Sequence, residues 1–272
     1  MKLNQITASQ RVALARHNER PTTREYIEAI FDDFFPLAGD RRHGEDASIL
    51  GGVAMFHGMP VTVIGHQKGR DLEENMKFRF GMPNPEGYRK AQRLMEQAEK
   101  FGRPVITFVD TPGAYPGLEA EAGGQGEAIA ASIALMSRLK VPTISVFIGE
   151  GGSGGALAIG VADKTIMLEN SIFSILSPEG FASILWKDAS RWEEAAEVMK
   201  LTAEDLQELG ICDLIIPEGE GAHVEKNLVF NAVERELISA LNVLMKKKGE
   251  ALAEERYKKL RNVGRKTWQE SK

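Results

Sequence analysis

The sequence predicts an α/β fold, and one pattern that occurs three times predicts it. In each occurrence a short run rich in β-branched residues precedes a stretch rich in glycine, and apolar residues at helical spacing follow. The three runs span residues 61–64, 105–109 and 143–148. Strands that alternate with helices in this way build layered α/β domains.

The first of these strands is expected to belong to a hairpin. Residues 47–67 contain no Asp, Glu, Lys or Arg and are long enough to cross a bilayer, but they include His57, Pro60 and several glycines. A β-hairpin with strands 51–56 and 61–64 and a turn at His57 and Gly58 explains this segment better. No membrane span is therefore expected.

Capping signals and apolar spacing locate the other elements. Thr22 to Glu25 and Thr202 to Asp205 both have the pattern of a capping box that starts a helix. The other expected elements are helices over 88–101 and 128–136, strands over 165–168, 172–176 and 213–216, and a helical tail over 225–262. We expect a single domain with an N-terminal helical segment (1–40), a core (41–224) and a C-terminal helical tail (225–272).

The composition is that of a folded protein with no need of crosslinks. The chain has 272 residues, of which 43% are apolar and 27% charged. Its one cysteine, Cys212, excludes a disulfide framework and a cysteine-rich zinc site carried by this chain alone. No apolar stretch follows the N-terminal residues, so a secretory signal is not indicated, and we expect a cytoplasmic protein.

The charge balance argues against nucleic acid as a partner. Thirty-four basic and 39 acidic residues give a net charge of −5, and no basic stripe alternates with aromatic residues. The one basic run, Lys246 to Lys248, is expected to be a solvated helix end.

The glycine-rich stretches are the candidate sites of chemistry. A glycine-rich turn between a strand and a helix exposes backbone N–H groups at the positive end of the helix dipole, which suits a phosphate or a developing oxyanion. Alternatively, the glycines serve only tight turns and close packing. Gly149, Gly151 and Gly154 formally match the dinucleotide fingerprint, with Glu169 at the distance of a ribose ligand, but little room is left for a crossover helix before residue 165.

A serine hydrolase is the main competing hypothesis. Ser153 lies in a Gly-x-Ser-x-Gly pattern between a predicted strand and a helix, as a nucleophile elbow requires. His223 and Asp213 are the available partners for a triad.

Metal binding is not predicted for this chain. The five histidines show no paired spacing, and each is expected on the surface or in a turn. Asp110, at a predicted strand end, is a candidate ligand or base, or else the cap of the turn that follows.

Five ordered motifs resemble the carboxyltransferase α subunit of bacterial and plastid acetyl-CoA carboxylase. They span residues 64–70, 80–91, 110–117, 149–160 and 177–186, and the resemblance covers roughly residues 10–260. It implies a crotonase-like fold, a spiral of ββα units with helical additions at both ends.

The resemblance also implies an activity and partners. The family's α chain works with a β chain, which carries a four-cysteine zinc site and most of the acetyl-CoA contacts, in an α2β2 assembly that is inactive as separate chains. A carrier protein, charged by a biotin carboxylase, brings carboxybiotin, and the carboxyl group passes to acetyl-CoA to form malonyl-CoA for fatty-acid synthesis. A non-catalytic scaffold with the same fold is a further alternative.

The motifs also carry site residues onto this sequence. The N–H groups of Gly154 and Gly155, ahead of a helix at Ala156, are implied donors to the biotin ureido oxygen, and Ser153 becomes a packing residue. Gly113 and Ala114 are the second candidates for a donor or wall of this pocket. Lys68 and Arg70 are candidate contacts for a CoA phosphate or an acidic carrier face, or else belong to an exposed charged turn.

Overall fold

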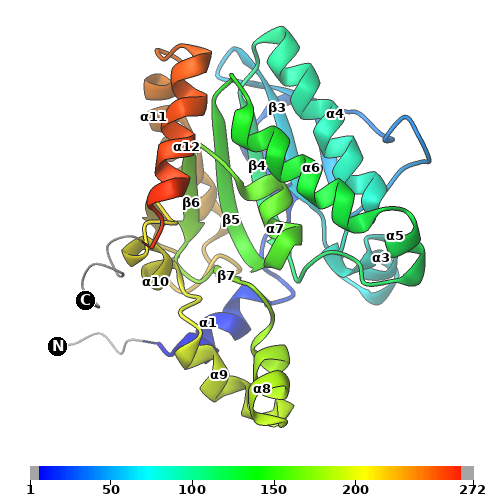
Figure 1. The fold of residues 1–272 in the computed structure, drawn as a ribbon. Helices are drawn as coiled ribbons and strands as arrows, with labels where there is room; N and C mark the ends of the chain where they lie inside the picture. Colours follow the sequence, from blue (N-terminus) through cyan, green and yellow to red (C-terminus); the bar gives the residue numbers. More distant parts are fainter. Residues whose placement is uncertain (1–5, 265–272) are drawn as a thin grey trace, which may run out of the picture.

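The structure is a computed structural model that describes residues 6–264. Its centre is an eight-stranded sheet in the order β1-β2-β3-β4-β5-β6-β8, with β7 paired to β5 (Figure 1). β1 and β3 pair with β2 antiparallel, whereas β3, β4, β5, β6 and β8 form a parallel series. The strands are β1 (Asp32–Pro36), β2 (Ile49–Phe56), β3 (Met59–His66), β4 (Val105–Thr111), β5 (Thr143–Gly152), β6 (Lys164–Leu168), β7 (Ile172–Ser174) and β8 (Leu214–Ile216).

Helices cover both faces of this sheet, which confirms the α/β prediction. α4, α6 and α7 pack on one face, and α2 and α11 pack on the other. The helices before β5 are α1 (Ala8–Ala15), α2 (Thr23–Ile30), α3 (Leu72–Lys77), η1 (Arg79–Gly81), α4 (Pro85–Phe101), α5 (Leu118–Ala122) and α6 (Gln125–Arg138). Those after it are α7 (Ser153–Gly160), α8 (Pro178–Trp186), η2 (Ala189–Arg191), α9 (Trp192–Val198), α10 (Ala203–Glu208), α11 (Lys226–Leu244) and α12 (Gly249–Asn262).

Several local predictions are confirmed. β2 and β3 form the expected hairpin, and no helix among residues 6–264 is long and apolar enough to cross a membrane. Capping boxes start α2 at Thr22 and α10 at Thr202. Gly102 ends α4 with a left-handed backbone (φ 69°), which glycine adopts without steric cost.

The glycine-rich stretch after residue 148 is the main correction. β5 continues to Gly152 and α7 begins at Ser153, so residues 149–152 are strand and the helix starts before Ala156. The strand requires glycine here because neighbouring groups leave no room for a side chain. A Cβ on Gly149 would lie 2.5 Å from the Asp110 carboxylate, and one on Gly152 would lie 2.1 Å from a backbone oxygen. The glycines of residues 149–152 therefore allow close packing of the strand against its neighbours and do not form a loop.

Three further boundaries differ from the expected ones. Asp110 and Thr111 lie inside β4, not after it. Strand β1 interrupts the expected N-terminal helical segment, because it pairs with the edge of the hairpin. The C-terminal tail is two helices, α11 and α12, and the basic run Lys246 to Lys248 lies in the turn between them, partly exposed as expected. Residues 1–5 and 265–272 of the expected terminal segments lie outside the described residues.

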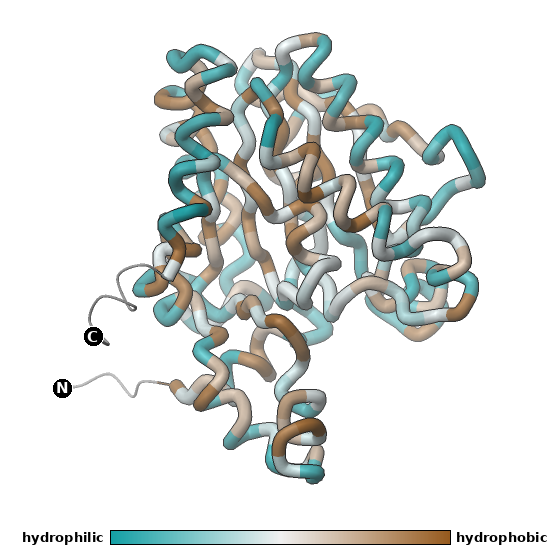
Figure 2. The backbone as a smooth tube through the Cα atoms, viewed as in Figure 1, coloured by the Kyte–Doolittle hydropathy of each residue, from teal (hydrophilic) through white to brown (hydrophobic). Residues whose placement is uncertain are grey.

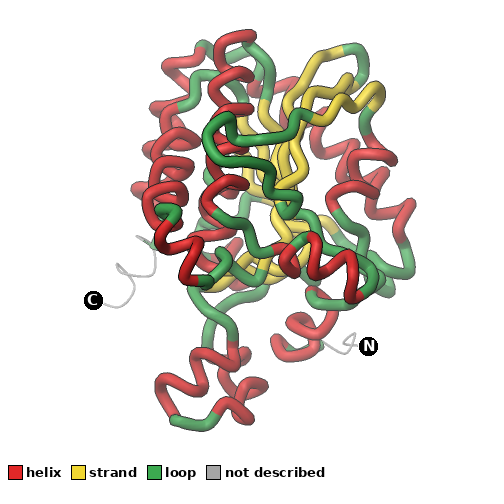
Figure 3. The backbone as a smooth tube through the Cα atoms, turned by 90° about the vertical axis from the view of Figure 1, so that its right-hand side faces the viewer, coloured by secondary structure: helices red, strands yellow, loops and turns green. Residues whose placement is uncertain are grey.

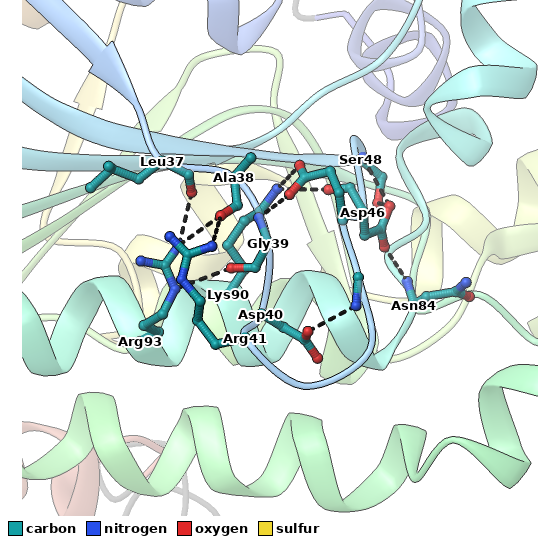
Figure 4. A network of polar contacts seen from close by, with 12 residues as sticks. Leu37, Ala38, Gly39, Asp40, Arg41, Asp46, Ser48, Asn84, Lys90 and Arg93 are labelled. Atoms are coloured by element: carbon teal, nitrogen blue, oxygen red, sulfur yellow. Dashed lines mark hydrogen bonds and ion pairs between the residues drawn. The ribbon is translucent and has the colours of Figure 1, made fainter.

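The loop between β1 and β2 is clamped onto the start of α4 (Figure 4). Arg93 donates to the Leu37 carbonyl at 2.9 Å, and the buried Lys90 donates to the Asp46 carbonyl at 2.8 Å. The Asp46 carboxylate accepts the N–H of Asn84 at 2.6 Å, which satisfies a free donor at the head of the helix. The clamp therefore fixes α4 at the edge of the sheet where the parallel strands end.

A helical arm projects from the same end of the molecule. α8, η2 and α9 extend away from the sheet after β7, as the ribbon and the turned tube view show (Figures 1 and 3). Apolar residues follow the central strands and also occur on this arm (Figure 2). The root of the arm is a small apolar cluster in which α9 packs on α1.

Candidate functional site

The site lies where β3, β4 and β5 end. The three strands are parallel neighbours, so their carboxyl ends, at His66, Thr111 and Gly152, meet at one edge of the sheet. Segments that leave such an edge are the usual ligand contacts in parallel α/β sheets. The sequence motifs around Lys68, Gly113 and Gly154 all begin here.

The first turn of α7 offers unpaired backbone donors. Gly154 and Gly155 are the second and third residues of this helix, and the first four N–H groups of a helix have no partner within it. Ser153 ahead of them has φ 49°, a left-handed backbone that turns the chain sharply from strand into helix. The turn thus presents N–H groups at the positive end of the helix dipole.

The structure brings the two predicted donor segments, Gly154 with Gly155 and Gly113 with Ala114, together. A Cβ on Gly155 would lie 2.7 Å from the Ala114 nitrogen and 2.7 Å from the Gly113 carbonyl carbon, so the two backbones touch. Gly113 has φ 148°, which a residue with a side chain rarely adopts. The segment of Gly113 and Ala114 is therefore one wall of the α7 turn.

Lys68 lies beside this wall but is already paired. Its ammonium donates to the Asp110 carboxylate at 2.6 Å, and the same carboxylate oxygen accepts the N–H of Glu150 at 2.9 Å. Asp110 therefore joins three strand ends. It does not cap the following turn, because Thr111 accepts the N–H of Gly113 there at 3.0 Å.

Arg70 is directed elsewhere. Its guanidinium donates to the carbonyls of Asn18 at 2.6 Å and Arg20 at 3.0 Å, and it pairs with Glu25. These contacts tie the turn after β3 to the segment between α1 and α2. Lys68 is partly buried and paired, whereas Arg70 is exposed, as the alternative of a charged surface turn expects, with its charge paired to Glu25.

Two buried polar groups under the turn were not predicted. His66 is fully buried, and its Nε2 has no hydrogen-bond partner, so the expectation of a surface or turn histidine is wrong at this position. Burial, assisted by the charge of Lys68, lowers the pKa of His66 to about 3, which keeps the ring neutral. The Tyr88 hydroxyl, also unpartnered, lies 3.0 Å from the Cβ position of Gly155. Apolar spacing predicts Tyr88 as core but gives no sign of where its hydroxyl points.

An apolar groove opens next to Gly154. Its volume is about 470 Å³, and its lining residues include Ser153, Leu157, Phe173 and Ile175. A size of ~300–1,000 Å³ with mostly apolar walls and a few polar groups is typical of small-molecule sites. Gly154 lies at the wall of the groove, and Ser153 and Ser174 are its polar lining residues.

Comparisons with known proteins decide the family. A family model described as "Acetyl co-enzyme A carboxylase carboxyltransferase-like" matches residues 2–264. The chain belongs to this family. A relative from Clostridium acetobutylicum is 59% identical over 262 residues, covering 96% of both chains. One from Listeria monocytogenes serotype 4b is 56% identical over 260 residues, covering 95% of this chain and 82% of the relative. Both are named acetyl-coenzyme A carboxylase carboxyl transferase subunit alpha.

Solved structures confirm the crotonase-like fold. The transcarboxylase 12S structure with methylmalonyl-coenzyme A superposes with a TM-score of 0.71 at 19% identity, covering 90% of this chain and 46% of that one. The chain thus spans about half of the transcarboxylase chain. A Pseudomonas malonate decarboxylase hetero-tetramer in complex with coenzyme A gives a TM-score of 0.65 at 21% identity, covering 79% and 86%.

The hydrolase hypothesis does not survive the geometry of this carboxyltransferase family member. His223 stacks on His17 with ring centroids 4.0 Å apart, and Asp213 accepts the Thr165 N–H at 2.6 Å while pairing with Lys259. Within residues 6–264 no hydrogen bond joins Ser153, His223 and Asp213. A triad requires those bonds, so the structure does not assemble one.

Dinucleotide binding is also excluded as a role for the glycine motif. The Glu169 carboxylate accepts the N–H of Glu218 at 3.1 Å, so it is committed to the backbone. The helix that follows the motif, α7, has only eight residues.

Metal ligands are not clustered in the part of the chain that the structure describes. Residues 6–264 contain no group of three or more His, Cys, Asp or Glu side chains arranged to hold an ion. Cys212 is buried, and burial raises its pKa to about 11, so it is a thiol that packs.

Proposed function

We propose that this chain provides the carboxybiotin side of a carboxyltransferase that forms malonyl-CoA from acetyl-CoA. The observation that carries the proposal is the position of Gly154 and Gly155 in the first turn of α7, where N–H groups have no acceptor within the helix, beside Gly113 and Ala114, in a chain of the acetyl-CoA carboxylase carboxyltransferase family. The same turn borders an apolar groove of about 470 Å³, which suits a carrier-borne ring with an aliphatic arm.

The chemistry requires charge stabilisation more than a nucleophile. Carboxybiotin, when bound, would supply an activated carboxyl group, and negative charge would develop on its ureido oxygen as CO2 leaves. The N–H groups of Gly154 and Gly155 bind that oxygen most strongly when it is charged. Loss of one such donor typically costs ~3–4 kcal/mol of transition-state stabilisation. Without a Cβ on either residue, the ligand approaches the backbone closely.

The other side chains at the turn have supporting roles in this proposal. Ser153 turns the chain from β5 into α7, and its hydroxyl takes no part in the reaction. Asp110 holds the ends of β4 and β5 in register by accepting the Glu150 N–H, and its carboxylate neutralises Lys68. Lys68 would bind a phosphate of CoA or an acidic face of the carrier only if that anion displaced it from Asp110. Arg70 contributes indirectly, because its contacts with Asn18, Arg20 and Glu25 hold the turn after β3 in place.

We propose further that a β subunit completes the site in an α2β2 assembly. It would bring the four-cysteine zinc site and most contacts to acetyl-CoA, and a biotinylated carrier protein, loaded by a biotin carboxylase, would dock at the groove. The exposed apolar side chains around the groove and arm support an interface, since Ile175 is 77% and Ile184 61% exposed in the single chain.

Reconstitution tests the proposal. The chain is co-expressed with a four-cysteine zinc β subunit, and malonyl-CoA-dependent carboxylation of biocytin, the reverse reaction, is followed for the mixture and for each chain. Activity is expected only in the mixture. A well-formed complex without activity would contradict the proposal.

One substitution separates catalysis from a scaffold role. Gly154→Val places a branched side chain in the first turn of α7 (residues 153–155, the donor turn), where a Cβ would already lie 3.3 Å from Ile129. We expect an assembled but inactive complex. Full activity in that complex would favour the non-catalytic scaffold.

A further inference from the structure

Glu150 is the one long side chain near the end of β5 that can anchor the strand end to the rest of the fold. Between residues 149 and 155 the sequence has only two non-glycine residues, Glu150 and Ser153. The Ser153 side chain accepts and donates no hydrogen bond in the structure, whereas the Glu150 carboxylate is 91% buried and is bound by a guanidinium. Pairing with β4 and β7 holds the backbone of this strand end, and Glu150 adds its one side-chain anchor ahead of Gly154 and Gly155.

That guanidinium belongs to Arg16, the residue that ends α1. Its Nε and Nη2 donate to one oxygen of Glu150, at 2.9 and 2.6 Å. Its Nη1 donates to Glu179 at 2.7 Å. The backbone of Glu150 is held on the other side by Asp110, which accepts its N–H at 2.9 Å. Two independent contacts thus fix the strand three residues before the α7 turn.

Glu179 belongs to the projecting arm. It lies in the first turn of α8, after the cap at Ser177 and Pro178. α8 packs on η2 and α9, and α9 packs on α1, so Glu179 is the residue of α8 that forms an ion pair with the body of the molecule. Burial raises the pKa of Glu179, but the hydrogen bonds to Arg16, Ser177 and its own backbone N–H, together with the Arg16 charge, outweigh burial and lower the pKa, so the pair stays ionised.

We propose that Arg16 is a positioning residue: by binding Glu150 and Glu179 with one guanidinium, it couples the orientation of the α8 and α9 arm to the placement of the Gly154 and Gly155 donors. The proposal rests on the proposed function and extends it to a residue far from the glycine motif in sequence. A contact made by the arm with a partner would then reach the donor turn through Arg16. A planar fork that serves two carboxylates suits this task, and an ammonium group does not.

Kinetics of the reconstituted complex test the role of Arg16. For Arg16→Gln, we expect kcat for biocytin carboxylation to fall about 10–100-fold, the scale of a misplacement of about 1 Å at a reacting centre. The KM for malonyl-CoA is expected to stay within about twofold, because the donor turn faces biotin. Arg16→Lys should recover part of kcat, since it can bind Glu150 or Glu179 but not both. A lower thermal stability with unchanged kcat per folded complex would overturn the proposal.

A second variant isolates the link to the arm. Glu179→Gln removes the arm's carboxylate and leaves the bonds between Arg16 and Glu150 in place. We expect kcat to fall about 3–10-fold, within the range that positioning effects span. Glu194→Gln is the matched control, because Glu194 pairs with Arg191 inside the same arm and forms no ion pair with another part of residues 6–264. Equal behaviour of the two variants would show that the arm is not coupled.

Hydrogen exchange separates this inference from the proposed function. In Glu179→Gln, we expect faster amide exchange in residues 178–198 and also in residues 150–157. Faster exchange in the arm alone would refute the coupling even if the enzyme is active. An inactive wild-type complex would refute the proposed function, while the exchange pattern would still decide the coupling.

Discussion

Gly155 and Ala114 approach so closely that a Cβ on Gly155 would lie 2.7 Å from the Ala114 nitrogen. Real Cβ atoms do not approach a backbone nitrogen to this distance, so the helix start of α7 and the segment after β4 interlock through a glycine. The contact joins the two candidate donor segments, and it makes their relative position sensitive to a single methyl group.

Gly155→Ala is therefore expected to lower carboxyl transfer by about 100-fold or more, the cost of losing an oxyanion donor. The added methyl group has to push α7 away from Ala114. Gly154→Ala should lose about tenfold or less, because its methyl group meets only the Ile129 side chain, at 3.3 Å. The measurement is biocytin carboxylation by the reconstituted complex.

Gly126 provides the control for these two variants. A Cβ there would meet nothing within 4 Å, and the residue lies in α6. Gly126→Ala should keep full activity and stabilise the chain by about 0.5 kcal/mol. A similar loss in Gly126→Ala and Gly155→Ala would contradict the interlock.

Ser153→Ala is expected to keep activity within about threefold, because charge stabilisation comes from backbone N–H groups and not from this hydroxyl. The same assay measures it. Ser153→Gly relieves the left-handed backbone at φ 49° and should be at least as stable as the wild type. Loss of a catalytic serine removes nearly all turnover, so a collapse of activity in Ser153→Ala would contradict charge stabilisation by backbone N–H groups alone.

His66 should make stability depend on pH. Its pKa is about 3 in the folded chain and 6.5 as a free side chain, so between these values the unfolded chain binds the extra proton. The free energy of unfolding therefore falls as pH drops below 6.5. From pH 7 to pH 5.5 this one group should cost about 1 kcal/mol.

Urea titrations of the wild type and His66→Gln at the two pH values measure this effect. The glutamine does not titrate, so the variant should lose less stability on acidification, while all other groups contribute equally to both proteins. An identical pH dependence would mean that His66 takes up its proton in the folded chain.

Arg256 should be essential for the stability of the C-terminal helix. Its guanidinium is fully buried, pairs with Asp163 at 2.8 Å and donates to the carbonyl of Met136 at 2.7 Å. Arg256→Ala leaves Asp163 buried without its partner, which typically costs 3–5 kcal/mol. Lys258→Ala, which breaks an exposed pair with Glu254, should cost less than about 0.5 kcal/mol in the same denaturation experiment.

Local signals predicted the elements that local physics controls. The hairpin of β2 and β3, the capping boxes at Thr22 and Thr202 and the C-cap at Gly102 each depend on a few neighbouring residues. The boundary at residues 149–152 was missed for the opposite reason. Glycine in this stretch looks like a loop, and only the tertiary neighbours Asp110 and Pro112 show why a strand without side chains fits there.

The sequence by itself determined the α/β class, the family and the identity of the glycine segments, because strand and helix periods and the order of motifs are properties of the residue order alone. Only the tertiary structure decided which of them touch. Parallel pairing of β3, β4 and β5 brings residues 68, 113 and 154 to one edge, buries His66 and pairs Lys68 with Asp110. The bridge from Arg16 to Glu150 and Glu179 joins residues more than 130 positions apart, and no local pattern encodes contacts at such separations.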